Sequence, residues 1–333
     1  MSDNDTVVFE SPETVTVEQR DIPTPNPDEV LVESRRTLVS TGTELTILSG
    51  DFPEGSRWDH YEYPFVPGYN NVGVVVETGD DVVDIEIGQR VATLGSHAQY
   101  VTASAEGCRP IPDDVSDDAV VFFTIAEIVM NGVRRGEVTW GESAVVFGLG
   151  LLGQLAVRVC ELAGAQPVVG VEPSVPRLDR LPDAPAVAAV DPTAEAAEDA
   201  VARLTADRMA DVAFEVTGNP AVIPGEFDVL REQGRLVVLS SPRGTTEFNF
   251  HDDCNAPSHT IIGAHNSSHP SVATPANPWT NHRHCELFFS ALADGSISVT
   301  ELVSHRIDVA DVPAMYDDLL ADRSEAMGVV ITW

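Results

Sequence analysis

The chain has 333 residues, which is more than one compact core usually holds, so we expect two domains. It carries 53 acidic and 19 basic side chains, all of the latter arginine, for a net charge of −34. This balance argues against nucleic acid as a partner.

Cysteine usage and the N-terminus indicate a reducing environment. The four cysteines lie far apart and form no C-x-x-C pair of the kind used in zinc lobes and redox motifs. The first ten residues lack a basic start and an apolar core, and the sequence has no apolar run of about 18 residues. We therefore expect a cytoplasmic protein that does not associate with membranes.

The N-terminal part of the chain predicts a β-rich domain. Short apolar stretches between Thr6 and about Ala103 are separated by Pro, Gly, Asn and Asp, which is the pattern of strands joined by turns. A long helix is predicted to begin near Ser116, where an Asp/Ser-rich start precedes apolar residues at helical spacing.

Strands and helices alternate in the next part. Residues 143–173 read as an apolar strand, a glycine turn, an amphipathic helix and a second apolar strand ending in an acid, which is a βαβ unit. The alternation continues through 209–218, 227–241 and 259–268, so a mostly parallel sheet covered on both faces is expected. A helix at 281–295 and a short strand-helix-strand end complete the chain.

A glycine motif lies inside the βαβ unit. Gly148, Gly150 and Gly153 form G-x-G-x-x-G after a strand and before a helix, the context that a dinucleotide-binding turn requires. The first glycine permits the tight turn, the second lets a pyrophosphate approach, and the third lets helix and strand pack closely. We expect the whole turn to bind the cofactor: Gly148, Leu149, Gly150, Leu151, Leu152 and Gly153. The alternative is a glycine turn in a nucleotide-free α/β domain.

The second strand of the unit ends in an acid. Glu172 lies 19 residues after Gly153, where a carboxylate can accept hydrogen bonds from both ribose hydroxyls and would repel a 2′-phosphate. This predicts NAD as the cofactor. Arg177, a few residues later, leaves NADP open, although a structural surface arginine is the alternative interpretation.

The motifs appear in a recognisable order: "STGTE", "PFVPGYNNVGVVVETGDDV", "IGQRVATLGSHAQYV", "AVVFGLGLLG", "VVGVEP" and "AFEVTGNP". This order resembles the medium-chain dehydrogenase/reductase superfamily over nearly the whole chain. The resemblance implies an α/β protein with a GroES-like catalytic domain at 1–118 and 301–333 and a Rossmann domain at 119–300. The GTE, GYxNVG and GxHAxYV forms look most like the branch that includes bacteriochlorophyllide a dehydrogenase.

The sequence departs from the zinc-binding members of this superfamily. Thr41 stands where a ligand cysteine is usual, and Gly68-Tyr69-Asn70 replaces Gly-His-Glu. Neither a threonine hydroxyl nor a phenol is a ready ligand for zinc, which prefers thiolate and imidazole. We therefore predict no metal ligands. A site rebuilt from His97, Glu44 and Glu127 is the alternative.

Without zinc, oxidation of an alcohol still needs a group that takes the hydroxyl proton. Imidazole is the natural base near neutral pH, so His97 is the first candidate. Tyr69 is predicted to orient the substrate oxygen, and Thr43, at the position of the superfamily's relay hydroxyl, to pass the proton on. Glu44 is predicted to order the cleft. Each of these residues also has a structural interpretation: a turn contact for His97, a wall for Tyr69, and caps at the start of a helix or turn for Thr43 and Glu44.

The predicted function is an NAD(H)-dependent oxidoreductase that interconverts a secondary alcohol and its ketone without the usual zinc. A zinc-free, NADPH-dependent reductase of an activated double bond or a quinone is one alternative. A dinucleotide-binding protein that has lost catalysis is another. The substrate itself cannot be inferred, because fold analogy does not fix it.

Two further properties are expected of the whole molecule. The acidic composition resembles that of halophilic proteins, so we expect stability to increase with salt. The apolar stretch at 259–268 is predicted to be an edge strand of the Rossmann sheet, which favours a homodimer paired across a two-fold axis.

Overall fold

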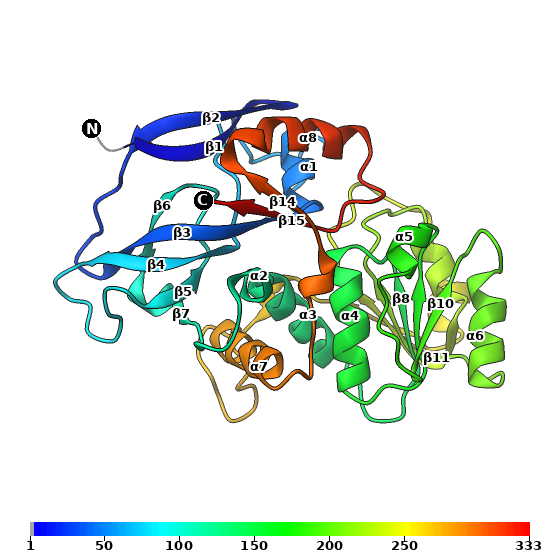
Figure 1. The fold of residues 1–333 in the computed structure, drawn as a ribbon. Helices are drawn as coiled ribbons and strands as arrows, with labels where there is room; N and C mark the ends of the chain where they lie inside the picture. Colours follow the sequence, from blue (N-terminus) through cyan, green and yellow to red (C-terminus); the bar gives the residue numbers. More distant parts are fainter. Residues whose placement is uncertain (1–2) are drawn as a thin grey trace. The chain divides into compact units, whose positions relative to one another are not determined.

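The computed structural model describes residues 3–333, which divide into two compact units (Figure 1). Of the described residues, unit 1 consists of 3–124 and Cys285–Trp333, and unit 2 of Ile125–His284. Unit 2 thus lies inside the 119–300 range predicted for the Rossmann domain. No helix of the described chain is long and apolar enough to span a membrane.

Unit 1 is built around one mixed sheet and one hairpin. The sheet has the order β14-β15-β3-β4-β5-β7, with β6 also paired to β3, and β1 and β2 form a separate antiparallel pair. Its strands are β1 (Asp3–Ser11), β2 (Thr14–Asp21), β3 (Glu29–Val39), β4 (Asn71–Thr78), β5 (Arg90–Thr93), β6 (Tyr100–Ser104), β7 (Arg109–Pro110), β14 (Val303–Asp308) and β15 (Gly328–Thr332).

Two helices of unit 1 carry residues of the candidate site. Helix α1 (Thr43–Ser49) directly follows the turn after β3, and α8 (Val312–Ala321) packs against it. Their apolar faces share one core with β1 and β15, in which Phe9 and Tyr316 meet edge to face at 5.2 Å. Burial of this core fixes the two helices relative to each other.

The long helix predicted from Ser116 is divided. Helix α2 (Asp117–Val120) begins where expected, with Ser116 at its N-terminal cap position. The backbone then tightens, because Phe122 N–H reaches back only to Ala119 O, and α3 (Phe123–Arg135) follows. The apolar spacing that predicted the helix is therefore shared by two consecutive helices.

Unit 2 is a doubly wound α/β domain. Its six strands are all parallel and have the order β10-β9-β8-β11-β12-β13. In chain order this is 3-2-1-4-5-6, the Rossmann arrangement, with the switch point between β8 and β11. The strands are β8 (Ala144–Phe147), β9 (Val168–Val171), β10 (Val187–Val190), β11 (Ala210–Glu215), β12 (Leu230–Val238) and β13 (Thr260–Gly263).

Helices cover both faces of this sheet, as the sequence predicts. On one face, α6 (Ala197–Thr205) and the short helix η2 (Ile223–Phe227) pack on alternate residues of β8, β9, β11 and β12. On the other face, α3 lies so close that a Cβ at its Gly132 would lie 2.6 Å from Leu239 Cδ1, and a Cβ at Gly136, directly after the helix, would touch Val237. The remaining helices of unit 2 are α4 (Leu151–Leu162), α5 (Val175–Leu178), η3 (Phe250–Asn255) and η4 (Asn266–Ser268), and α7 (Asn281–Ala293) runs on into unit 1.

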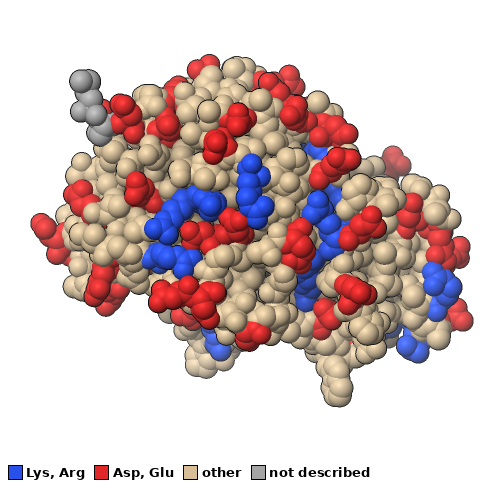
Figure 2. Space-filling model, viewed as in Figure 1, with Lys and Arg blue, Asp and Glu red and all other residues tan. Residues whose placement is uncertain are grey.

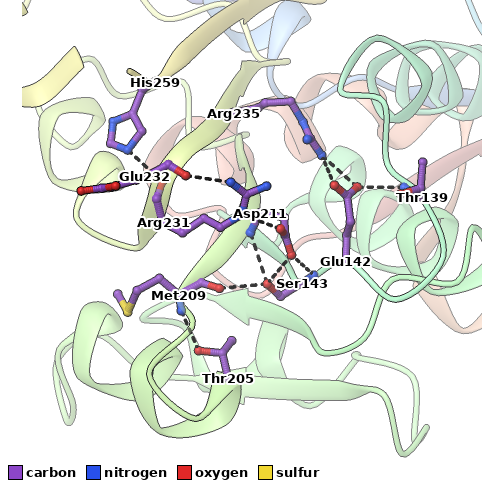
Figure 3. A network of polar contacts seen from close by, with 10 residues as sticks. All are labelled: Thr139, Glu142, Ser143, Thr205, Met209, Asp211, Arg231, Glu232, Arg235 and His259. Carbon is purple, nitrogen blue, oxygen red and sulfur yellow. Dashed lines mark hydrogen bonds and ion pairs between the residues drawn. The ribbon is translucent and has the colours of Figure 1, made fainter. Parts of the chain in front are cut away.

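A network of hydrogen bonds and ion pairs joins the amino ends of the central strands (Figure 3). Asp211 accepts hydrogen bonds from Ser143 N–H at 2.8 Å and from Arg231 Nε at 2.6 Å, and Arg235 binds both oxygens of Glu142 at 2.8 Å. These residues lie at the opposite end of the sheet from the glycine turn. Because ligands bind at the carboxyl ends of such strands, we assign this network a structural role.

Acidic side chains are spread over the face of the molecule seen in Figure 2 rather than gathered in one tail. Several of the arginines are paired with acidic groups, including Arg36 and Arg306, which both bind Asp118. The predicted adaptation to salt is compatible with this distribution and remains a prediction.

Candidate active site

The glycine turn of unit 2 has the geometry that the motif predicts. Gly148 follows β8 with φ of +88°, a left-handed conformation that favours glycine. A Cβ at Gly153 would lie 1.9 Å from Gly148 O, so no larger residue fits there. Gly150 differs from both, because a Cβ at this position would meet no atom within 4 Å. The open space lies at the N-terminus of α4, which fits the approach of a pyrophosphate.

Glu172 lies directly after β9 and faces the same turn. One carboxylate oxygen accepts Leu149 N–H at 2.9 Å and the other accepts Ser174 N–H at 3.1 Å. The Arg177 guanidinium lies 3.5 Å from Glu172 Oε2. Each carboxylate oxygen has a second lone pair, so the predicted bonds to ribose hydroxyls remain compatible with this arrangement.

A second turn borders the glycine turn at the switch point. The Thr217 backbone N–H lies 3.0 Å from the place a Gly148 Cβ would occupy. Glu215, at the carboxyl end of β11, accepts hydrogen bonds from Thr217 N–H at 2.7 Å and from Gly218 N–H at 2.8 Å. This fully buried carboxylate therefore shapes one wall of the dinucleotide site.

Unit 1 holds a cluster of hydroxyl groups around Tyr69. The phenol donates a hydrogen bond to Ser40 Oγ and lies 3.5 Å from Thr43 Oγ1. Burial raises the pKa of Tyr69 to about 12. The hydrogen bonds with Ser40 and Thr43 lower this pKa, and the negative charge of Glu44 raises it further. Tyr69 is therefore an uncharged phenol, able to donate a proton, across the neutral range.

Behind the hydroxyl cluster lies a buried charged group. Glu44 Oε2 is 3.0 Å from His97 Nε2 and accepts the Tyr316 hydroxyl, while Oε1 accepts Ser40 N–H at 2.9 Å. Burial alone would raise the pKa of Glu44. The electrostatic interaction and hydrogen bond with His97, together with the hydrogen bonds from Tyr316 and Ser40, outweigh burial and lower the pKa. Because a carboxylate only accepts, His97 Nε2 carries a hydrogen in this arrangement.

The position of His97 bears on its predicted role. The ring is fully buried and stacks on Gly68, whose added Cβ would lie 2.9 Å from His97 Cγ. A general base must reach the proton that it removes. The structure thus places His97 behind Glu44 rather than at an exposed position, and this favours a supporting role.

The two asparagines after Tyr69 hold strands together. Asn71 Nδ2 donates to Ser34 Oγ at 2.7 Å and to Ser96 O at 3.3 Å, and Asn70 Nδ2 donates to Leu38 O at 3.4 Å. Both side chains are fully buried. The polar bend therefore fixes the backbone that presents Tyr69.

The side chains do not match a catalytic zinc site. Glu44 and His97 bind each other in unit 1, whereas Glu127 accepts Asn281 Nδ2 at 3.2 Å in unit 2. Across residues 3–333, no group of three or more His, Cys, Asp or Glu side chains has a geometry that could hold a metal ion. The other groups around Tyr69 are hydroxyls, which zinc does not prefer. We derive no catalytic step through zinc.

Comparison with protein families now identifies the chain. Residues 26–113 match the alcohol dehydrogenase GroES-like domain, and residues 152–280 match the zinc-binding dehydrogenase family. The chain belongs to the medium-chain dehydrogenase/reductase superfamily. As a member it is an NAD(P)-dependent oxidoreductase of the zinc-type alcohol dehydrogenase-like group, and the predicted fold class of a GroES-like domain with a Rossmann domain is confirmed.

Relatives within the superfamily differ in the alcohols they are named for. The Escherichia coli D-guloside 3-dehydrogenase is 27% identical over 292 residues, which cover 86% of this chain and 82% of the relative. The Shewanella loihica L-threonine 3-dehydrogenase is 28% identical over 250 residues, covering 65% and 71%. A Sinorhizobium meliloti structure named for a zinc-binding dehydrogenase bound to NADP has a TM-score of 0.84 at 22% identity over the full length of both chains, which shows the shared fold.

Sequence reasoning missed three residues of these sites. Ser40 lies one position before the Thr41 to Glu44 motif, so its hydroxyl could have been noted. Tyr316 is 272 residues from Glu44, and no local pattern in the sequence connects the two. Glu215 closes a strand as Glu172 does, and this shared position was the available signal.

Proposed function

We propose that this chain interconverts a secondary alcohol of a sugar or sugar acid and the corresponding ketone, using NAD(H) and no catalytic zinc. The observation that carries the proposal is the hydroxyl cluster of Tyr69, Ser40 and Thr43 at the place where zinc-dependent relatives have metal ligands. Relatives named for D-guloside and L-galactonate support the substrate class. Bacteriochlorophyllide-type substrates are a further case of the same alcohol chemistry.

The chain's own groups provide the proton for this chemistry. In ketone reduction, the Tyr69 hydroxyl turns its hydrogen from Ser40 Oγ to the carbonyl oxygen of the substrate and then donates that proton, because burial keeps the phenol uncharged. Thr43, which is only partly buried, then passes a proton to the Tyr69 oxygen and takes one from solvent water in its place. The bound cofactor supplies the hydride that completes the reduction. Alcohol oxidation uses the same path in reverse.

Glu44 and His97 support the phenol from behind. The Glu44 carboxylate fixes Ser40 through its backbone N–H, and Ser40 in turn accepts the Tyr69 hydroxyl. The negative charge of Glu44 also disfavours a phenolate at Tyr69. His97 and Tyr316 keep this carboxylate ionised and in place.

A turnover assay with metal analysis tests the proposal. Purified protein is incubated with NAD⁺ or NADH and a panel of sugar alcohols, sugar acids, ketoses and simple ketones, and the nicotinamide absorbance is followed. We expect turnover with some members of the panel, little bound zinc and no inhibition by chelator. Tight NADH binding without turnover would favour a non-catalytic protein, and chelator-sensitive activity with stoichiometric zinc would contradict the zinc-free scheme.

Cofactor preference should depend on Glu172. We expect NADH to bind more tightly than NADPH, because the carboxylate repels a 2′-phosphate, and Glu172→Ser to narrow or reverse the difference. Arg177, 3.5 Å from Glu172, would then be released to bind the phosphate. Dissociation constants from NADH and NADPH fluorescence check this. Equal affinities in the unaltered protein would contradict it.

We also propose a homodimer formed through β13. This strand pairs with β12 on one side, lies last in the sheet order of unit 2, and exposes 45% of Ile261. An apolar edge of this kind favours pairing with a second copy. Light scattering in molar salt should give a dimer, and Ile261→Glu should give a monomer. A monomeric unaltered protein would overturn the proposal.

The environment proposed for the enzyme is a salt-rich cytoplasm. The high excess of carboxylates and the absence of lysine from the sequence support salt adaptation. The separated cysteines support a reducing compartment.

A further inference from the structure

One buried carboxyl group in unit 2 lacks any hydrogen-bond donor. Glu226 lies on η2, is 1% exposed, and neither of its oxygens has a hydrogen-bond partner within residues 3–333. An ionised carboxylate in such surroundings loses its hydration without compensation. The uncharged acid is therefore the stable form of this group in the folded protein.

The neighbouring carboxyl group, that of Glu215, is surrounded by hydrogen-bond donors. Glu215 on β11 is 0% exposed and faces four donors: Thr217 N–H, Thr217 Oγ1, Gly218 N–H and Ser240 Oγ. Hydrogen bonds of this kind stabilise a carboxylate. These two neighbouring acids thus differ in their surroundings, because Glu215 faces four donors and Glu226 faces none.

The other charged groups near η2 are engaged elsewhere. Helix η2 packs on β11 and β12, where Asp211 pairs with Arg231 and Arg235 pairs with Glu142 at the amino ends of the strands. Asp228 follows η2, and its pKa is raised by its burial and by Asp253. Arg231 and Arg235 are held by their partners in this network, and Glu215 is the charged group that acts on Glu226.

The pair is connected to the dinucleotide site through one turn. Glu215 holds the Thr217–Gly218 backbone, and Thr217 N–H packs on Gly148. A second negative charge beside Glu215 would repel it and weaken its hold on that turn. The Thr217–Gly218 turn would then no longer be held against the glycine turn at the switch point, where the cofactor binds.

We propose that Glu226 is a positioning residue for the dinucleotide site, which it keeps in the binding form only while its own carboxyl group is protonated. It acts through Glu215 and the Thr217–Gly218 turn. The inference rests on the assignment of the Gly148–Gly153 turn to the cofactor. Burial, with the charge of Glu215, raises the pKa of Glu226 to about 9, so the transition belongs to the alkaline range.

Binding of NADH as a function of pH tests the proposal. NADH is the suitable probe because it is stable in alkali and fluorescent. Between pH 7.5 and 10 we expect the Kd of the unaltered protein to rise about fivefold, which corresponds to a Glu226 pKa of about 9 that rises by about one unit on binding. Glu226→Gln, an uncharged isostere, should bind as tightly at pH 7.5 and show no such rise.

Proton uptake provides a readout that a merely structural role would not change. Near pH 9, calorimetry in two buffers of different ionisation enthalpy should show proton uptake on NADH binding by the unaltered protein and none by Glu226→Gln. Thermal melting at each pH identifies unfolding, and Glu226→Met serves if the glutamine variant does not fold. An equal pH dependence in the variant, or none in the unaltered protein, would overturn the proposal. Failure to bind NADH at pH 7.5 would overturn the cofactor assignment instead.

Discussion

Gly150→Ala should weaken NADH binding by about 10- to 100-fold while leaving the melting temperature unchanged. A Cβ at this position meets no protein atom within 4 Å, so the folded protein has room for the methyl group. The same space lies at the N-terminus of α4, where a pyrophosphate would approach the backbone. Crowding of a close-packed contact typically costs about 1–3 kcal/mol, which gives the expected loss of affinity. Fluorescence titration and thermal melting measure the two effects.

Two other glycines make this test specific. Gly263 on β13 also has no atom of its own chain within 4 Å of an added Cβ, so Gly263→Ala should leave NADH binding unchanged. Gly153→Ala should lower stability as well as binding, because its Cβ would lie 1.9 Å from Gly148 O. An unchanged Kd in Gly150→Ala would show that the cofactor does not approach there.

The dinucleotide turn could be predicted because its determinants are local. Gly148 to Gly153 lie where a strand passes into a helix, both evident from apolar spacing, and Glu172 directly follows the next strand. Each requirement concerns backbone conformation or close packing within about thirty residues. Such features can be predicted without knowledge of the rest of the fold.

The proton-transfer groups could not be predicted to the same extent. The sequence identified Tyr69, Thr43, Glu44 and His97, but not that His97 would be fully buried against Glu44. Glu44 is in turn bound by Tyr316, which α8 brings in from the far end of the chain. Long-range packing therefore decides which polar residue of a motif can face a substrate.

The protonation of Glu226 was likewise beyond sequence reasoning. A glutamate in a short segment before a strand reads as a solvated residue. Its lack of donors follows from the packing of η2 on β11 and β12. Only the assembled sheet shows that Glu215 already uses the donors at this edge.

Tyr69→Phe should lower kcat by about 10²- to 10⁴-fold, the usual contribution of a general acid or base, and leave the Kd of NADH nearly unchanged. The substitution removes the hydroxyl that donates to Ser40 and keeps the ring. Tyr63→Phe is a matched control, since the Tyr63 hydroxyl donates to Ile47 O in the same unit and has no proposed role in proton transfer. Steady-state kinetics and NADH titration separate the two variants.

The contrast with His97→Ala decides between the two proton-transfer schemes. Removing the imidazole leaves the buried Glu44 carboxylate without this partner, and breaking a buried pair of this kind typically costs about 3–5 kcal/mol of folding stability. If His97 only supports the cluster, the variant should melt at a lower temperature, and its activity loss should follow the loss of folded protein. If His97→Ala stays folded and loses activity by about 10²- to 10⁴-fold, while Tyr69→Phe remains active, His97 is the base and the phenol serves only to orient the substrate. Stoichiometric zinc that His97→Ala releases would instead make His97 a ligand and exclude both schemes.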